Sequence, residues 1–313
     1  MNHTNAWRSV QWESRGEIMK TDIYCEILCA AEDEPLARIY LEQASELFRD
    51  FEKCYSRFLV GNELWELNTS ADSAVVSPEL FSLLEQSLYW HKKTKGIFDP
   101  SILPYLESEG YGGAYGVVSE AAGKAVFGQL LLNKMTKAVS KPNGLKIDLG
   151  GIGKSFVIDK VADFFHEQFS HFLIDAGGDI MAAGENKALE YPYWAIGIED
   201  PAERERSVAT LILKNMAAAT SGINRRTWLK GDIRKHHLID PAKGESAEAD
   251  FQSVTVLMPT TVEADIWAKT LLLSGKEKGQ RLADEENIPA IFIFKDGSVS
   301  INNACKPYVW KSP

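Results

Sequence analysis

The segment KIDLGGIGKSFVIDK, residues 146–160, joins an apolar run to a helix-like run through three glycines and a Lys-Ser pair. Glycines let a backbone approach a phosphate closely, and a helix N-terminus offers unpaired N–H groups to an anion. The segment comes close to the P-loop pattern G-x-x-x-x-G-K-[ST], but Asp148 stands at the position of its first glycine. The residues leave three interpretations: a poor P-loop, a different nucleotide site, or a glycine turn with a solvated Lys154.

Composition places the chain among globular proteins. It has 313 residues, 45% of them hydrophobic and 25% charged, enough for one large domain or two small ones. The net charge of −10 argues against a nucleic-acid partner. We expect no transmembrane segment and no signal peptide or lipobox, because no apolar run is long enough. The four cysteines lack zinc spacing, which favours buried free thiols and a cytoplasmic location.

Strand-like and helix-like segments interleave without a strict βαβ rhythm, which predicts one α+β domain. Apolar spacing predicts helices over residues 35–58, 77–96, 156–169 and 260–275. Short apolar runs predict strands over residues 21–31, 171–176, 193–199, 208–213, 253–258 and 290–294. Residues 103–123 are rich in glycine and tyrosine and predict a loop. The tetrapeptides DLGG (148–151) and DAGG (175–178) each follow an apolar run, so both predict turns at strand ends.

The segment SGINRRTWLKGDIRKHHLIDPAKG, residues 221–244, carries a basic cluster ahead of two histidines. The cluster consists of Arg225, Arg226, Arg234 and Lys235. His236 and His237 suit acid–base work, phosphate contact or metal ligation, although no third ligand is spaced to complete a metal site. The alternative is a hairpin with an exposed basic loop.

One further pair has both a structural and a functional interpretation. Asp265 and Lys269 stand four residues apart on a predicted helix, which favours an ion pair; the alternative is a carboxylate for a magnesium ion that bridges phosphates. Asp99 precedes Pro100 and predicts an extended residue at a turn.

The order of these motifs is more specific than any one of them. MKT, SRFLVGNELWELN, GIFDPSILP, IDLGGIGKS, LIDAGGDI, ATSGINR, HLIDPAKG and ADIWAKTLLLSG follow one another along the chain. From about residue 17 to 275 the sequence resembles the ApbE family of FAD:protein FMN transferases. The resemblance implies residues 17–313 as a single T-fold-like α+β domain with mixed and antiparallel sheets and packed helices. Residues 1–16 are then an N-terminal extension, either disordered or folded over the cleft.

The resemblance also implies the chemistry and its residues. FAD would lie in an extended cleft with Mg²⁺, and its FMN half would pass to a Ser or Thr hydroxyl of an acceptor protein, with release of AMP. Matched by motif, the FAD contacts would be Met19, Phe58, Asn68, Ile97, Phe98, Asp99, Asp148, Lys154 and Ile239. Asp265 and the Gly151 carbonyl would hold magnesium, and His237 and Asp265 would be the catalytic residues.

The sequence departs from the family pattern at three positions. Lys269 stands where the family usually has a metal-binding Thr, Lys20 where Gly follows Met, and Ser155 where Gly follows Lys. We expect Lys269 either to pair with Asp265 or to supply part of the metal's charge. Two other functions use the same site: an FAD carrier that transfers nothing, and an FAD pyrophosphatase that releases FMN and AMP.

Overall fold

The computed structural model describes residues 7–71, 73–112, 127–142, 144–187, 192–203, 205–224 and 226–310. Its largest element is an eight-stranded sheet in the order β1-β2-β6-β7-β10-β15-β16-β17, and all neighbouring strands run antiparallel. The strands are β1 (Arg8–Ile18), β2 (Thr21–Cys29), β6 (Phe172–Ala176), β7 (Asp179–Ala183), β10 (Met216–Gly222), β15 (Phe251–Met258), β16 (Ala290–Phe294) and β17 (Val299–Ile301).

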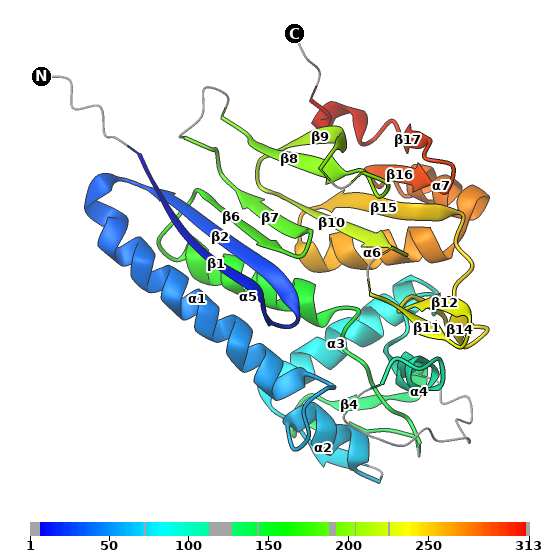
Figure 1. Cartoon of the computed structure of the whole chain (residues 1–313). Helices are drawn as coiled ribbons and strands as arrows, with labels where there is room; N and C mark the ends of the chain where they lie inside the picture. Colours follow the sequence, from blue (N-terminus) through cyan, green and yellow to red (C-terminus); the bar gives the residue numbers. More distant parts are fainter. Residues whose placement is uncertain are drawn as a thin grey trace, which may run out of the picture.

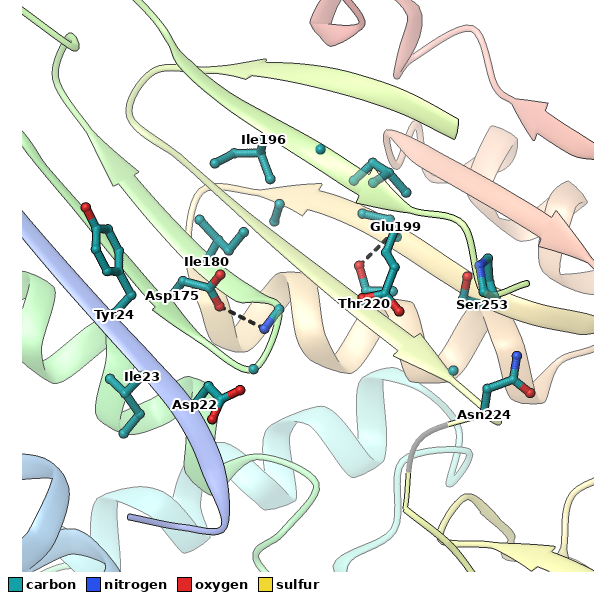
Figure 2. A pocket seen from close by; sticks show the side chains of 18 of the residues that line it. Asp22, Ile23, Tyr24, Asp175, Ile180, Ile196, Glu199, Thr220, Asn224 and Ser253 are labelled. Carbon is teal, nitrogen blue, oxygen red and sulfur yellow. Dashed lines mark hydrogen bonds between the residues drawn. The ribbon is translucent and has the colours of Figure 1, made fainter. Parts of the chain in front are cut away.

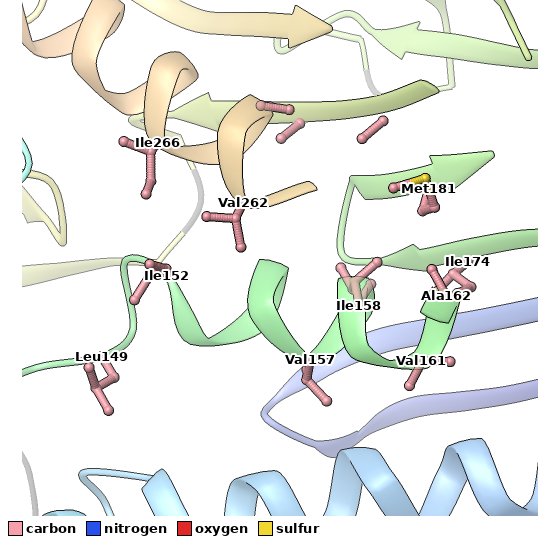
Figure 3. Close-up of a cluster of buried hydrophobic side chains, with 14 of the residues drawn as sticks. Leu149, Ile152, Val157, Ile158, Val161, Ala162, Ile174, Met181, Val262 and Ile266 are labelled. Carbon is pink, nitrogen blue, oxygen red and sulfur yellow. The ribbon is translucent and has the colours of Figure 1, made fainter. Parts of the chain in front are cut away.

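One face of this sheet is covered by helices α1 (Glu34–Tyr55), α5 (Gly153–His166) and α6 (Thr261–Leu273) (Figure 1). α5 buries an apolar stripe that includes Val157, Ile158 and Val161 against the sheet and its neighbouring helices (Figure 3). Residues spaced by three and four share one side of a helix, so this stripe orients α5 with its N-terminus at one end of the sheet. Helix α7 (Lys276–Glu285) follows α6 in the chain and packs against it.

The opposite face carries a two-stranded hairpin of β8 (Trp194–Glu199) and β9 (Ser207–Leu213). Trp194, Ile198, Leu211 and Leu213 belong to a second apolar cluster, which they share with outward-facing residues of the large sheet. In Figure 1 the hairpin lies close to β10 and β15, whose Ala218 and Leu257 belong to the same apolar cluster. The C-terminal segment adjoins β9 through the pairing of Leu211 with Val309.

The remaining elements gather below one end of the large sheet (Figure 1). They are α2 (Glu63–Thr69), β3 (Ser73–Val75), α3 (Pro78–Lys93), α4 (Leu103–Ser108), β4 (Leu131–Asn133), β5 (Ala138–Ser140), β11 (Thr227–Lys230), β12 (Ile233–His236), β13 (Ile239–Asp240) and β14 (Glu245–Ser246). Short 3₁₀ turns complete the chain at Ala31–Asp33, Pro100–Ile102, Phe127–Gln129 and Lys306–Tyr308.

The predicted α+β class with antiparallel sheets and packed helices is confirmed. The four predicted helices are α1, α3, α5 and α6, and their caps are the expected ones: the Ser77 and Thr260 side chains accept the backbone N–H of Leu80 and Glu263. The six predicted strands are β2, β6, β8, β9, β15 and β16. The hairpin predicted in the basic segment is β11–β12.

Three sequence-based assignments differ from the structure. Residues 8–16, assigned to an N-terminal extension, form most of β1 and pair with β2. The predicted loop over residues 103–123 begins as helix α4, and residues 113–123 lie outside the described part of the chain. The apolar run before DLGG forms no strand. It is held instead by the Asn68 amide, whose Oδ1 accepts the Ile147 N–H at 2.7 Å and whose Nδ2 donates to the Ile147 carbonyl at 2.9 Å.

In the described residues no helix is both long enough and apolar enough to cross a membrane. The free cysteines Cys25, Cys29 and Cys305 are buried as expected, whereas Cys54 is partly exposed.

Candidate functional site

A cavity of about 460 Å³ opens where the end of the large sheet meets the elements below it. This volume lies within the usual range for sites that bind small molecules. Ten of the residues predicted from the motifs line it: Met19, Phe58, Ile97, Phe98, Asp99, Asp148, Gly151, Lys154, His237 and Ile239. Residues far apart in the sequence therefore converge on one space. The motifs lie on turns and helix ends at the same end of the sheet.

Asp148 distinguishes the glycine loop of this site from a P-loop. Its carboxylate receives the Arg57 guanidinium at 2.9 Å, and both side chains are only 5% exposed. The same carboxylate accepts the Gly150 N–H, so it folds the glycine loop back on itself. A P-loop leaves space for a phosphate at this point, whereas this loop presents a neutralised carboxylate.

The glycine loop leads directly into α5. No side chain caps the first turn of this helix, and Gly150, Gly151, Gly153 and Lys154 all line the cavity. A Cβ at Gly153 would lie 3.0 Å from the ring of Phe51, so any other residue here would have to displace that ring. The helix start therefore brings both its dipole and an ammonium group to the cavity wall.

One wall of the cavity is aromatic. The Arg57 guanidinium contacts two rings, 4.3 Å from the centre of Phe58 and 4.5 Å from that of Tyr111. Tyr111 in turn stacks on Trp228, with centroids 4.7 Å apart and planes 16° apart. Phe58 keeps 37% of its surface exposed. A wall of this kind suits a planar heterocycle. The sequence predicted only Phe58 of this group.

The segment Ile97–Phe98–Asp99 is fixed by the end of α3. Thr94 accepts the Phe98 N–H through its hydroxyl at 3.1 Å, and the His91 ring is 3.0 Å from the Phe98 carbonyl. Asp99 caps the following 3₁₀ turn by accepting the N–H of Ser101. The segment therefore forms a rigid edge of the cavity.

Two ion pairs lie side by side behind the glycine loop. Lys154 reaches across to Asp179, with its ammonium 2.8 Å from a carboxylate oxygen, and also donates to the Ala176 carbonyl at 2.8 Å. Lys269 pairs with Asp265 one helical turn earlier. Burial and the neighbouring carboxylate of Asp265 raise the pKa of Asp179. Two ammonium groups and two carboxylates thus form one compact charge cluster, and both lysines line the cavity.

The predicted pairing of Lys269 with Asp265 is confirmed, and it bears on the predicted magnesium ion. One Asp265 oxygen is held by the Lys269 ammonium and the other accepts the Ser155 hydroxyl at 3.2 Å. Among the described residues, no group of three or more His, Cys, Asp or Glu side chains is arranged to hold a metal. A divalent cation at Asp265 would have to displace an ammonium that occupies its carboxylate. The residues present do not fit a bound Mg²⁺ in this arrangement.

His237 lines the cavity, and one of its ring nitrogens makes no hydrogen bond in the described structure. Its Nδ1 is buried and has no hydrogen-bond partner in the described structure. Burial, together with the positive charges of Arg226 and Lys269, lowers the pKa of His237 to about 3. The imidazole is therefore neutral near pH 7 and can accept a proton or a hydrogen bond from a ligand. The adjacent His236 also has a buried Nδ1 without a partner in the described structure, but its Nε2 is 3.0 Å from the Ala247 carbonyl and it does not line the cavity.

Two predicted site residues lie outside the cavity wall. Asn68 binds the backbone of Ile147 and so supports the loop that carries Asp148. Asp265 is 3% exposed and lies behind Lys269. Of the predicted basic cluster, Arg226 lines the cavity, Lys235 forms an ion pair with Glu109, and Arg225 is outside the described residues.

The turn between β1 and β2 carries local strain. Ile18 pairs with Thr21, so Met19 and Lys20 form a two-residue turn, and their φ angles are 54° and 50°. Such turns require left-handed backbone, which side chains other than glycine adopt at a cost. The turn places both residues in the cavity, with the Lys20 ammonium 4.9 Å from the centre of the Phe58 ring.

Comparison with known proteins agrees with this geometry. Residues 19–292 match the model of the ApbE family. The FAD:protein FMN transferase of Treponema pallidum is 30% identical over 291 residues, which cover 85% of this chain and 80% of that protein. The enzyme of the same name from Vibrio cholerae is 30% identical over 271 residues, 82% of this chain and 80% of that protein.

Solved structures show the same fold. An ApbE protein from Thermotoga maritima superimposes with a TM-score of 0.84 at 24% identity, covering 96% of this chain and all of that one. A flavin transferase ApbE from Vibrio cholerae gives a TM-score of 0.80 at 24% identity, covering 97% of this chain and all of that one. With its motifs gathered around one cavity and a family match over most of its length, the chain belongs to the ApbE family.

Proposed function

We propose that this protein is an FAD:protein FMN transferase. It takes FAD as its substrate, moves the FMN half to a Ser or Thr hydroxyl of an acceptor protein, and releases AMP. The observation that carries the proposal is the pairing of an aromatic wall with a buried ammonium pair in one cavity. A planar heterocycle joined to a pyrophosphate requires both features. The names of the Treponema and Vibrio relatives support the same activity.

In the proposed reaction the acceptor hydroxyl oxygen attacks the phosphorus of the FMN phosphate. A new P–O bond forms to the acceptor, the bond to the AMP phosphate breaks, and AMP leaves with the electron pair. Negative charge on the phosphates must be balanced throughout, which Lys154 and Lys269 can do from the cavity wall. His237 lines the cavity and its Nδ1 has no hydrogen-bond partner in the described structure, so it is the residue we assign to accept the hydroxyl proton.

We give Mg²⁺ no step in this reaction, because Lys269 holds the carboxylate predicted to bind it. Asp265 then acts by orienting Lys269 rather than as a metal ligand. The predicted Gly151 carbonyl remains at the cavity wall, where the glycine loop borders the proposed pyrophosphate position. We place the reaction in the cytoplasm, where buried free thiols such as those of Cys25 and Cys305 persist.

The test is to incubate the protein with FAD and a Thr-containing acceptor peptide and to measure AMP and the mass of the peptide. Transfer predicts AMP and a flavin-bearing peptide in equal amounts. AMP and FMN with an unchanged peptide would instead establish a pyrophosphatase, and bound FAD without AMP would establish a carrier.

A matched histidine pair tests the site assignment. His237→Gln is expected to lower the rate of transfer by about 10²–10⁴-fold while FAD still binds. His236→Gln should leave the rate near that of the unaltered protein, because this side chain bonds to the Ala247 carbonyl away from the cavity. Equal losses in both variants would contradict the role given to His237.

A further inference from the structure

The end of helix α4 is joined to the β11–β12 hairpin by one buried carboxylate. Glu109 directly follows the last residue of α4 and is 5% exposed, yet it does not line the cavity. Its Oε1 lies 2.9 Å from the Lys230 ammonium of β11, and its Oε2 lies 2.6 Å from the Lys235 ammonium of β12. One side chain therefore holds both strands of the hairpin.

The Glu109 carboxylate carries its charge at neutral pH although it is buried. Burial alone would raise the pKa of Glu109, but the hydrogen bonds from Lys235 and Lys230 lower it to about 2. Lys235 is itself largely removed from water, and the Lys230 ammonium also donates to the Ser108 carbonyl at 2.8 Å. The hairpin is therefore attached to α4 by charged groups that lie mostly inside the protein.

The backbone at Glu109 also shapes the aromatic wall of the cavity. The Glu109 carbonyl accepts the Trp228 indole N–H at 2.7 Å. Gly110 and Tyr111 come next in the chain, and both line the cavity together with Trp228. The end of α4 thus supplies one ring of the Tyr111–Trp228 stack and the hairpin supplies the other. The stack requires the two segments to stay in place relative to each other.

A second set of bonds leads from Glu109 to the peptide group that carries His237. The Glu109 Oε2 accepts the Ser246 N–H at 3.4 Å, and the Ser246 hydroxyl donates to the His236 carbonyl at 2.8 Å. That carbonyl belongs to the peptide bond between His236 and His237. Lys235, the other partner of Oε2, lies two residues before His237 in the chain. The position of His237 at the cavity is therefore tied to the Glu109 carboxylate.

The hairpin has little support from the rest of the fold. β11 and β12 form a two-stranded sheet of their own and do not join the large sheet. Leu229 and Ile233 are exposed, so these apolar side chains add nothing to a core. An isolated two-stranded hairpin is marginally stable in water. The place of this hairpin beside the cavity therefore rests largely on its contacts with Glu109 and Tyr111.

We propose that Glu109 is a positioning residue for FMN transfer. Its carboxylate, with its partners Lys230 and Lys235, forms a latch that fixes the β11–β12 hairpin to the end of α4 and so sets the places of Trp228 and His237. Glu109 acts through these two residues, because it does not itself line the cavity. The inference rests on the proposed transferase function and adds a residue that no motif of the sequence indicates.

A matched pair of variants tests the latch by its effect on transfer to the Thr-containing peptide. Glu109→Gln keeps the size of the side chain and removes the charge that both lysines share. The control is Glu185→Gln, because Glu185 also pairs with two lysines, Lys187 and Lys214, and does not line the cavity. We expect kcat to fall by about 10–10²-fold in Glu109→Gln, as a displacement of about 1 Å can do, and to stay unchanged in the control. Equal losses in both variants, or no loss in either, overturn the proposal.

Two NMR signals report the positions of these side chains without turnover. The indole N–H signal of Trp228 is identified by its absence in Trp228→Phe, and the ring signal of His237 by its absence in His237→Gln. Both should shift in Glu109→Gln and stay in place in Glu185→Gln. The His237 signal decides, because its ring is connected to Glu109 only through Ser246 and the hairpin. An unchanged His237 signal in Glu109→Gln overturns the proposal.

A second pair of variants decides the question if Glu109→Gln does not fold. Lys235→Met breaks one arm of the latch and leaves Glu109 paired with Lys230, whereas Lys235→Arg keeps a cation at the same position. The methionine variant is expected to lower kcat and to shift the His237 signal, and the arginine variant to restore both. Equal values in the two variants contradict the latch.

The latch and the transferase function fail in different ways. If the unaltered protein releases no AMP and labels no peptide, the transferase proposal fails, and the His237 signal alone then decides whether the latch exists. If the unaltered protein and Glu109→Gln transfer FMN at the same rate with the same His237 signal, the transferase function stands and the latch is overturned.

Discussion

Replacing Lys269 with threonine tests whether an ammonium stands in for a metal ion in this protein. In the structure the side chains of Lys269 and Asp265 are only 15% and 5% exposed, so the pair is largely removed from water. Removing one partner of a buried ion pair costs about 3–5 kcal/mol, because the other charge stays buried. Asp265 keeps the Ser155 hydroxyl, so we expect the lower figure, about 3 kcal/mol.

The same substitution should create a metal response that the unaltered protein lacks. Lys269→Thr frees one carboxylate oxygen and adds a hydroxyl one turn away, and both are oxygen donors of the kind that Mg²⁺ prefers. At a concentration 100 times its dissociation constant, Mg²⁺ would restore about 2.7 kcal/mol of stability. The assay is urea unfolding of the FAD-free protein in EDTA and in MgCl₂, so it needs no turnover.

A double variant shows whether the lost stability comes from the unpaired Asp265 carboxylate or from general damage to the fold. Asp265→Asn combined with Lys269→Thr removes both charges, so it should be less destabilised than Lys269→Thr alone and should not respond to Mg²⁺. The reasoning is refuted if Mg²⁺ stabilises the unaltered protein as much as it stabilises Lys269→Thr. It is refuted equally if Lys269→Thr unfolds at the same urea concentration as the unaltered protein in EDTA.

Three further predictions concern the cavity. Arg57→Met leaves the Asp148 carboxylate buried and unpaired and should cost about 3 kcal/mol in urea unfolding, with much of the loss recovered when Asp148→Asn is added; no recovery would contradict the pairing. Lys20→Gly removes a side chain from left-handed backbone and should stabilise the protein by about 1 kcal/mol in thermal unfolding, whereas a loss would show that the turn is unstrained. His237 has its pKa lowered to about 3, so between that value and about 6.5 the unfolded chain binds a proton that the folded chain does not. Unfolding free energy should therefore fall by about 2 kcal/mol from this residue between pH 7.5 and pH 5, and His237→Gln should remove that part of the fall; identical pH dependence in both proteins would refute it.

Much of the site was predicted from the resemblance of the ordered motifs to the ApbE family, since each motif alone also fits a turn or a surface ion pair. Asp148, Lys154 and His237 come together as expected. Their partners were not foreseen. Tyr111 and Trp228 become a ring stack only through a contact between residues 117 positions apart. In the sequence alone, an aromatic residue that packs in the core cannot be told from one that lines a binding site.

The sequence did not predict strands β7, β10 and β1, and their residues show why. β7 and β10 are rich in alanine, in DIMAA and MAAATSG, and alanine favours helices when a segment is taken alone. In the sheet each lies between two neighbours, and small side chains let α6 pack closely against them. Pairing between distant segments therefore overrides local preference. For β1 a signal existed, since Val10, Trp12 and Ser14 alternate with exposed residues.

The turn between β6 and β7 also determines which side of the sheet two aspartates face. Gly177 and Gly178 form its two-residue turn with φ angles of 63° and 89°, and Asp175 and Asp179 project from opposite sides of the sheet, Asp175 toward the face that carries β8 and β9 (Figure 2) and Asp179 toward Lys154. Side chains in a strand alternate, so inserting or deleting one residue here would exchange the two sides. Both glycines have a positive φ, and a Cβ at Gly177 would clash with the Thr21 hydroxyl, so this turn tolerates neither a change of length nor the loss of that glycine.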